Sequence, residues 1–184
     1  IVSIAAYGGN AAAQRSRNAC NRDCLIELTK SYLAAVVTHN TSAAPLAGNI
    51  VFVENVTAMK PGEGLWATAT SGPTAFAIYV PDVDQQQAGF LGVMERKTQS
   101  GTEPVLVAIR LGVEGGKITQ AEHIVAGVMA NNMARLQVPR PGLLAEVPAG
   151  SRKSHDVLVK IGLSYYDALD DIDGTLMPIS DACH

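Results

Sequence analysis

The stretch PLAGNIVFVENVTAMKPGEGLW (Pro45–Trp66) holds the sharpest contrast in the sequence, because a carboxylate interrupts an apolar run. The run predicts a β-strand over Ile50–Val56, and the Gly-Glu-Gly-Leu-Trp segment predicts a turn followed by a short helical or irregular piece. Alternate residues of a strand share a face, so Glu54 lies on the same side as Ile50 and Phe52. A carboxyl group among apolar side chains has a raised pKa and can exchange a proton near neutral pH. A glutamate at the end of a strand that faces water is the alternative.

A helix is expected before this strand and four more strands after it. Apolar residues recur with a helical period from Cys20 to His39, which predicts an amphipathic helix. Strands are expected at Ala75–Val80, Gly89–Thr98, Glu103–Val113 and Lys117–Ala126, with tight turns at QSGT and EGG between the last three. This order predicts an α+β roll, in which the helix packs on a curved antiparallel sheet. A small β-barrel is the alternative.

One strand shows why a helix must cover the sheet. Alternate residues of Glu103–Val113 are all apolar on one side, namely Val105, Val107, Ile109, Leu111 and Val113. A continuous apolar face of this length has to be buried against another layer.

The composition excludes several classes of partner. The chain has 184 residues, of which 47% are hydrophobic and 17% charged, and a net charge of -3 with 14 Lys and Arg. No basic run interleaves with aromatic residues, so nucleic-acid binding is not expected. No apolar stretch approaches the roughly 20 residues that span a bilayer, so no membrane partner is expected.

The amino-terminal segment and the cysteines bear on the compartment. Residues 1–19 are interpreted as a leader, either disordered or derived from a secretory signal, because they are rich in small residues. Cys20 and Cys24 share one face of the predicted helix, while Cys183 lies far along the chain. A disulfide in a secreted or periplasmic protein is the favoured interpretation, with the pairing open, and reduced structural cysteines are the alternative. The CNRDC motif has no second Cys/His pair behind it, so no metal is expected.

A segment near the carboxyl end repeats the beginning of the domain. Leu25–Val51 aligns without a gap against Leu158–His184, so that every pair of matched residues keeps the same offset in number. Five positions are identical, namely Leu25/Leu158, Ser31/Ser164, Tyr32/Tyr165, Ala35/Ala168 and Pro45/Pro178. The expected organisation is one domain over residues 20–135, a linker over 136–153, and a segment 154–184 that begins a second repeat or docks on another subunit.

The helix with SYLAAVVTHN, the strand LAGNIVFVEN, the GEGLW turn and the meander that ends in GGKITQAEHIVAG together resemble the nuclear transport factor 2-like (NTF2-like) superfamily, whose enzymatic branch is called SnoaL-like. The resemblance is greatest to an exported tandem-domain family of unassigned function. It covers Cys20 to about Gly127, with a weaker echo over Ser154–His184. It implies a conical roll whose open mouth holds a pocket, and it implies no cofactor. Members include isomerases, dehydratases and purely binding or dimerising modules, so fold alone does not define the chemistry.

Three residues are candidates for acid–base chemistry at such a pocket. Glu54 lies near the mouth if the resemblance holds, and Glu95 and His123 occur within predicted strands. A histidine–carboxylate pair on inward positions abstracts a proton next to a carbonyl and returns it elsewhere, without a metal. A lone strand histidine is, alternatively, structural or exposed. The candidate ligand-binding residues are Tyr32, Asn55, Trp66 and Tyr79, of which Tyr32 and Trp66 can equally be core and Asn55 can equally serve a turn.

Two functions follow as alternatives. The first is a cofactor-independent lyase or isomerase acting on a small carbonyl-containing or hydroxylated compound. The second is a non-catalytic module that binds a small-molecule ligand or assembles, for instance into a homo-oligomer. Polar groups that converge in one pocket favour the first, and an interior filled by Phe52, Trp66, Phe76 and Phe90 favours the second.

Overall fold

A computed structural model describes residues 19–179 of the chain. It divides into two compact units, Ile1–Leu144 and Ala145–His184. The first unit contains α2 (Arg22–Val37), η1 (Thr41–Ala43), β1 (Leu46–Glu54), β2 (Thr57–Met59), α3 (Leu65–Thr68), β3 (Ala69–Ser71), β4 (Ala77–Asp82), β5 (Gln87–Thr98), β6 (Gly101–Glu114), β7 (Lys117–Gly127), η2 (Ala130–Leu136) and α4 (Pro141–Leu144). The second contains η3 (Ala149–Ser151), α5 (His155–Asp170) and η4 (Gly174–Leu176).

Helix α2 is set by its cap and its apolar stripe. The Asn21 side chain accepts a hydrogen bond from the Cys24 amide at 2.9 Å, which satisfies one of the free N–H groups at the helix start. The chain leaves the helix after Thr38, where His39 takes a left-handed conformation at φ 55°. The predicted helix is confirmed, and its ends lie two residues inside the predicted ones.

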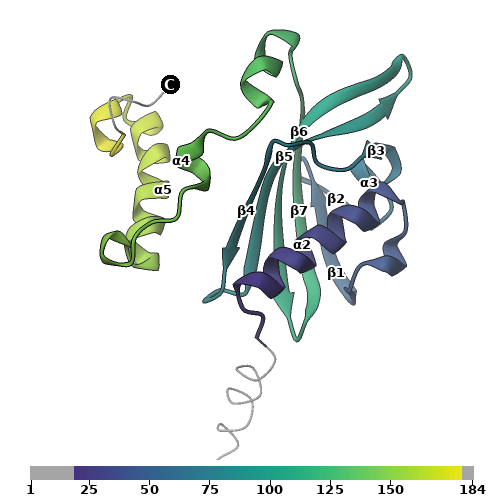
Figure 1. Cartoon of the computed structure of the whole chain (residues 1–184), viewed down its shortest axis with the longest axis horizontal. Coiled ribbons are helices and arrows are strands. Elements are labelled where there is room, and N and C mark those ends of the chain that lie inside the picture. The colour runs from purple at the N-terminus through teal and green to yellow at the C-terminus, as the bar shows by residue number, and fades with distance from the viewer. Residues whose placement is uncertain (1–18, 180–184) are drawn as a thin grey trace, which may run out of the picture. The chain divides into compact units, whose positions relative to one another are not determined.

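The strands form one curved sheet in the order β2-β1-β7-β6-β5-β3, with β4 also paired to β5. Helix α2 crosses one face of this sheet (Figure 1). The α+β roll is confirmed, and the barrel alternative is wrong because β2 and β3 end the sheet as separate edges. One detail differs from the antiparallel prediction: β1 and β7 pair in parallel, with Glu54 opposite His123.

The first hairpin departs from the prediction at its turn. The strand ends at Glu54 rather than at Val56, because Asn55 and Val56 both take positive φ values, 47° and 58°, and lead into β2. A two-residue turn of this kind normally carries Asn-Gly, so the β-branched Val56 hides it in the sequence. The hairpin between β6 and β7, which turns at Gly115 and Gly116, has the expected glycines at positive φ.

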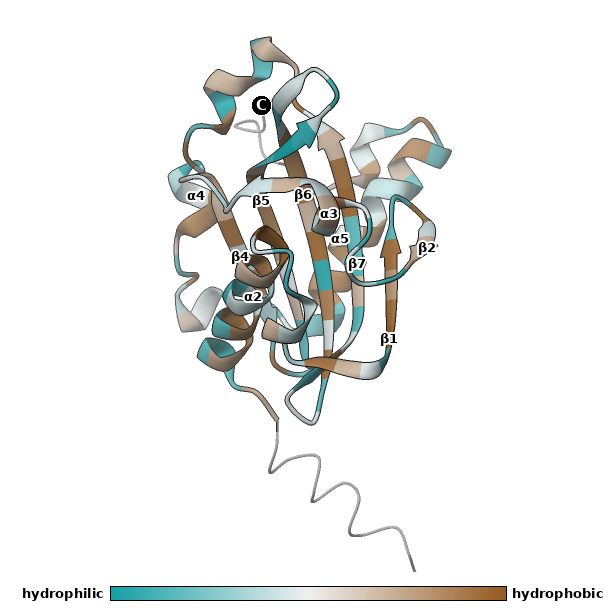
Figure 2. Cartoon of the chain, turned by 90° about the vertical axis from the view of Figure 1, so that its right-hand side faces the viewer, coloured by the Kyte–Doolittle hydropathy of each residue, from teal (hydrophilic) through white to brown (hydrophobic). Residues whose placement is uncertain are grey.

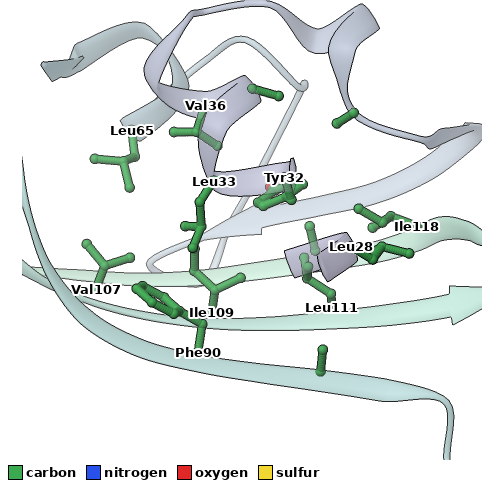
Figure 3. Packing of buried hydrophobic residues seen from close by; sticks show 14 of the residues in the cluster. Leu28, Tyr32, Leu33, Val36, Leu65, Phe90, Val107, Ile109, Leu111 and Ile118 are labelled. Carbon is green, nitrogen blue, oxygen red and sulfur yellow. The ribbon is translucent and has the colours of Figure 1, made fainter. Parts of the chain in front are cut away.

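The core lies between α2 and the concave face of the sheet. The five alternate residues of β6 from Val105 to Val113 are all buried there, as predicted. Figure 3 shows part of this cluster, with side chains of β6 facing Leu33, Tyr32 and Val36 of the helix, and with Leu65 of α3 at one end. A smaller cluster of Phe76, Ile78 and Val93 occupies the other face. The hydropathy colouring of Figure 2 shows apolar segments along these strands.

The structure pairs two of the cysteines. Cys20 and Cys24 form a disulfide with their Cα atoms 5.1 Å apart. Cys183 and all but the last residue of the expected leader, residues 1–19, lie outside the described residues. Gln86, in the turn between β4 and β5, accepts a hydrogen bond from the Cys20 amide at 2.7 Å and donates one to the Cys20 carbonyl at 2.9 Å. The disulfide is therefore tied to the sheet. None of the helices within residues 19–179 is long and apolar enough to cross a membrane.

Candidate functional site

Four side chains from four elements meet in the core and are named here the polar cluster. They are Glu54 of β1, His123 of β7, Tyr32 of α2 and Trp66 of α3. The parallel register places Glu54 and His123 side by side on the concave face. The helix lays Tyr32 over them, and the turn before α3 brings Trp66 to the same point. All four are buried, with exposed fractions between 1% and 7%.

A single row of hydrogen bonds joins the cluster. His123 Nδ1 lies 3.3 Å from Glu54 Oε2, His123 Nε2 lies 2.8 Å from the Tyr32 hydroxyl, and Trp66 Nε1 donates to that hydroxyl at 3.2 Å. The bonding pattern assigns one tautomer. A neutral ring that donates from Nδ1 to Glu54 and accepts the Tyr32 hydroxyl at Nε2 satisfies every partner. A ring with protons on both nitrogens would leave the Tyr32 hydroxyl proton without an acceptor in this row.

The Glu54 carboxylate has a second partner in the turn before α3. The Leu65 amide donates to both of its oxygens, at 2.9 and 3.2 Å. Gly64 makes this approach feasible: its φ is +62°, and a Cβ there would lie 2.5 Å from Glu54 Oε1. Burial raises the pKa of Glu54, but the hydrogen bonds from His123 and Leu65 outweigh it and the net pKa is lowered. The predicted raised pKa is therefore wrong, because the sequence shows the apolar neighbours and not the two donors.

Aromatic packing holds the other members in place. The Tyr32 and Trp66 rings meet edge to face with centroids 5.4 Å apart, and Phe52 packs edge-on to His123 at 4.9 Å. The Trp66 carbonyl also bonds to the ring of His39, at the end of α2. Burial is the main cause that raises the pKa of Tyr32 well above its usual range. Tyr32 therefore stays protonated and keeps its donor role.

The polar cluster is a hydrogen-bonded series of groups that can transfer protons, and all four of its side chains are buried. A tyrosine, a histidine and a carboxylate in series are the groups that acid–base catalysis uses. Within residues 19–179, however, every buried side-chain nitrogen and oxygen has a hydrogen-bond partner. The interior is also filled, since Phe52, Trp66 and Phe90 are buried in the main core, whereas Phe76 is buried in the smaller cluster on the other face. This arrangement stabilises the fold in the state described.

An open groove lies elsewhere, between α2 and β4. It has a volume of about 420 Å³, and α2 contributes Lys30, Leu33, Ala34 and Val37, with Thr38 directly after the helix. The opposite wall is formed by Gly72 and Pro73, which connect β3 to β4, and by Tyr79 of β4. The Lys30 ammonium lies 6.0 Å from the centre of the Tyr79 ring and 2.7 Å from Glu27. The groove is therefore apolar, with one cation and one phenol beside each other.

The remaining predicted residues fall in different places. The structure does not bring Glu95 to the cluster: it lies exposed on β5, on the face opposite to the buried Met94. The Asn55 side chain binds the backbone of β7. Its Nδ2 donates to the Val125 carbonyl at 3.1 Å, and its Oδ1 accepts from the Val125 amide at 2.9 Å. Tyr79 reaches the groove. Within the described part of the chain, no group of three or more His, Cys, Asp or Glu residues is placed to hold a metal ion.

Sequence reasoning missed two contributors. Gly64 has a signal in the sequence, since a glycine two residues before a tryptophan in GEGLW marks a backbone that needs a positive φ. Lys30 has none, because a lysine on the exposed side of a helix looks like any other. Its position beside Tyr79 depends on the packing of α2 against β4.

No protein-family model and no curated protein matches the chain. Solved structures do resemble it. AusH from Aspergillus nidulans is 8% identical with a TM-score of 0.49, over 59% of this chain and 88% of that one. The BvnE pinacolase from Penicillium brevicompactum is 13% identical with a TM-score of 0.48, over 63% and 92%. An NTF2-like protein from Burkholderia xenovorans is 12% identical with a TM-score of 0.46, over 64% and 98%.

A protein with a ketosteroid isomerase-like fold and an NTF2-like protein are among the structures that resemble the chain. At these identities and TM-scores the likeness carries no argument about chemistry. Any assignment of chemistry therefore depends on the polar cluster and the groove.

Proposed function

We propose that the first unit is a small-molecule-binding module whose site is the groove between α2 and β4. The observation that carries this proposal is the groove itself, an open apolar hollow of about 420 Å³ beside a filled interior. Sites for small ligands have this size range and this character, with a few polar groups among apolar walls.

The polar groups of the groove define the class of ligand. Leu33, Val37 and Pro73 offer apolar contact, whereas Lys30 supplies a positive charge and Tyr79 a hydroxyl. Lys30 keeps its charge, because the hydrogen bond and the charge of Glu27 raise its pKa. The matching ligand has an apolar ring or short chain and one anionic or hydrogen-bond-accepting group, such as a carboxylate.

Binding is tested by titrating the protein with naphthalene-2-carboxylate in ligand-observed NMR. Ala34→Trp fills the groove and is expected to abolish binding, whereas Ser31→Trp, on the same helix and outside the groove, is expected to leave it unchanged. Lys30→Gln is expected to weaken the carboxylate about threefold and to leave its methyl ester unaffected, as for one exposed charge interaction. Equal binding by the Ala34→Trp and Ser31→Trp variants would contradict the proposal.

The polar cluster supports a second candidate function, a cofactor-independent isomerase or lyase. The supporting observation is the fixed tautomer of His123, with a carboxylate on one nitrogen and a hydroxyl on the other. Here His123 is the base, Glu54 orients it, and Tyr32 donates the second proton. Glu95 has no role in it, because it lies exposed on the other face.

This candidate is tested by solvent exchange. An isomerase would incorporate deuterium next to the carbonyl of a bound ketone such as 2-tetralone, and His123→Asn would stop that incorporation. Circular dichroism of the variant checks that it folds. No incorporation above the buffer rate by the wild-type protein would remove the candidate and leave the binding proposal intact.

We also propose that the protein works in an oxidising compartment, as a secreted or periplasmic protein. The disulfide between Cys20 and Cys24 supports this, because such bonds persist mainly outside the reducing cytosol.

A further inference from the structure

Helix α5 repeats α2 at the level of the backbone. In the alignment that pairs Leu25 with Leu158, the first residue of α2, Arg22, corresponds to the first residue of α5, His155, and the last residues correspond in the same way. The short helices that follow, η1 and η4, also begin and end at matched positions of this alignment. The structural repeat and the sequence repeat therefore share one register.

The N-cap residues of the two helices and the left-handed residues that follow the helices correspond as well. Asn21 and Ser154 both cap their helix by accepting a hydrogen bond from the amide three residues on. His39 and Ile172 both take left-handed conformations, with φ values of 55° and 53°. An isoleucine rarely adopts this conformation, so its occurrence at the equivalent position is informative.

The hydrogen bonds after the helix match up to the start of the first strand. The Asn40 amide donates to the Ala35 carbonyl at 3.0 Å, and the Asp173 amide donates to the Ala168 carbonyl at 3.1 Å. The Leu46 amide donates to the Ala44 carbonyl at 2.8 Å, and the Ile179 amide donates to the Met177 carbonyl at the same distance. Leu46 begins β1, so Ile179 stands where a first strand begins.

The apolar faces of the two helices differ in how far they are covered. Four core positions of α2 have apolar counterparts on α5. Their exposed fractions are 0% and 56% for Leu25/Leu158, 8% and 43% for Leu28/Ile161, 1% and 50% for Tyr32/Tyr165, and 0% and 59% for Val36/Leu169. An apolar face of this extent on a helix marks a contact surface.

We propose that α5 is the covering helix of a second unit of the same fold. Its apolar face packs on the concave face of a second curved sheet, which the same polypeptide supplies beyond the described residues. A second copy of the first unit does not fit this role, because α2 already fills the concave face of its sheet.

The proposal is tested by hydrogen–deuterium exchange on the polypeptide purified from its native source, compared with the chain of residues 1–184. The amides of α5 are expected to exchange roughly 100-fold more slowly in the native polypeptide than in this shorter chain, as for a helix packed in a domain. The amides of α2 are expected to be equally protected in both, because the first unit is the same.

Matched variants locate the covered face. In the native polypeptide, Ile161→Asp is expected to remove the protection of α5 and to leave that of α2, since Ile161 corresponds to the buried Leu28. Lys160→Asp, which corresponds to the exposed Glu27, is expected to leave both unchanged.

Four outcomes would overturn the proposal. The native polypeptide could end at His184, or its α5 could exchange as fast as in the chain of residues 1–184. Protection in that shorter chain that grows with protein concentration would identify a second copy as the cover. Protection that needs an added protein would identify a foreign partner.

Discussion

Two neighbouring residues of β7 make side-chain pairs in opposite surroundings. Glu122 faces solvent and pairs with Arg110, at 2.7 Å between Oε1 and Nη2. His123 faces the core and pairs with Glu54, at 3.3 Å between Nδ1 and Oε2. The side chains of the outer pair are 35% and 52% exposed, and those of the inner pair 0% and 10%. The outer contact is the shorter one, yet we expect the inner contact to contribute more to the free energy of unfolding.

The two pairs differ in what takes the place of a partner that is removed by mutation. Water takes the place of Arg110 at the surface, so the outer pair contributes little net free energy. In the core, a lost partner leaves a buried donor or charge without any bond, and the full cost of its desolvation appears. Burial, rather than distance, therefore ranks the two pairs.

The largest expected effect comes from Glu54→Leu. This change leaves the Leu65 amide and the His123 ring N–H unpaired in the core. The free energy of unfolding, measured in urea, is expected to fall by about 2 to 6 kcal/mol, because each buried donor without a partner costs about 1 to 3 kcal/mol. Glu122→Leu is the matched control on the outer pair, and an equal loss in both variants would break the comparison.

Gly64→Ala tests the position of the Glu54 carboxylate by placing a methyl group against it. A Cβ at this position would lie 2.5 Å from Glu54 Oε1 and would take a left-handed conformation. We expect a loss of about 2 kcal/mol. Gly62→Ala is the control, because its φ is also positive but its nearest neighbour is 3.8 Å away. A thermal unfolding curve for Gly64→Ala that matches the control would show that the carboxylate moves freely.

The pH dependence of stability isolates the contribution of Glu54 to the free energy of unfolding. Because its pKa is lowered in the folded protein, its contribution to stability is present above the unfolded value of 4.5 and is lost as pH falls through the folded value. The difference in unfolding free energy between wild type and Glu54→Gln is expected to shrink below about pH 4.5, by about 1.4 kcal/mol for each pKa unit of lowering. A difference that stays constant down to pH 2 would contradict this assignment.

The smallest effect is expected for Arg110→Ala. Removing one partner of a half-exposed pair is expected to lower the free energy of unfolding by about 0.2 to 1 kcal/mol, and less at high salt. Urea unfolding at low and high salt measures both quantities. A loss well beyond this range would mean that the outer pair is not the weak one.

The pattern of the sequence is enough to predict the helix, the long strands and their inward faces, because periodicity directly reflects burial. It is not enough for the partners of Glu54, since His123 lies far along the chain and is brought there by a parallel pairing that local signals do not show. The turn at Asn55 was hidden for a different reason, because Val56 rarely takes such a conformation. Lys30 and Tyr79 meet only through tertiary packing.

The parallel pairing of β1 with β7 also has a kinetic consequence. The pairing of β1 with β7 closes a long loop, so we expect it to form late during folding. Trp66 is the single tryptophan of the chain, and it donates to the hydroxyl that touches His123. Its fluorescence is therefore a built-in reporter of that closing step.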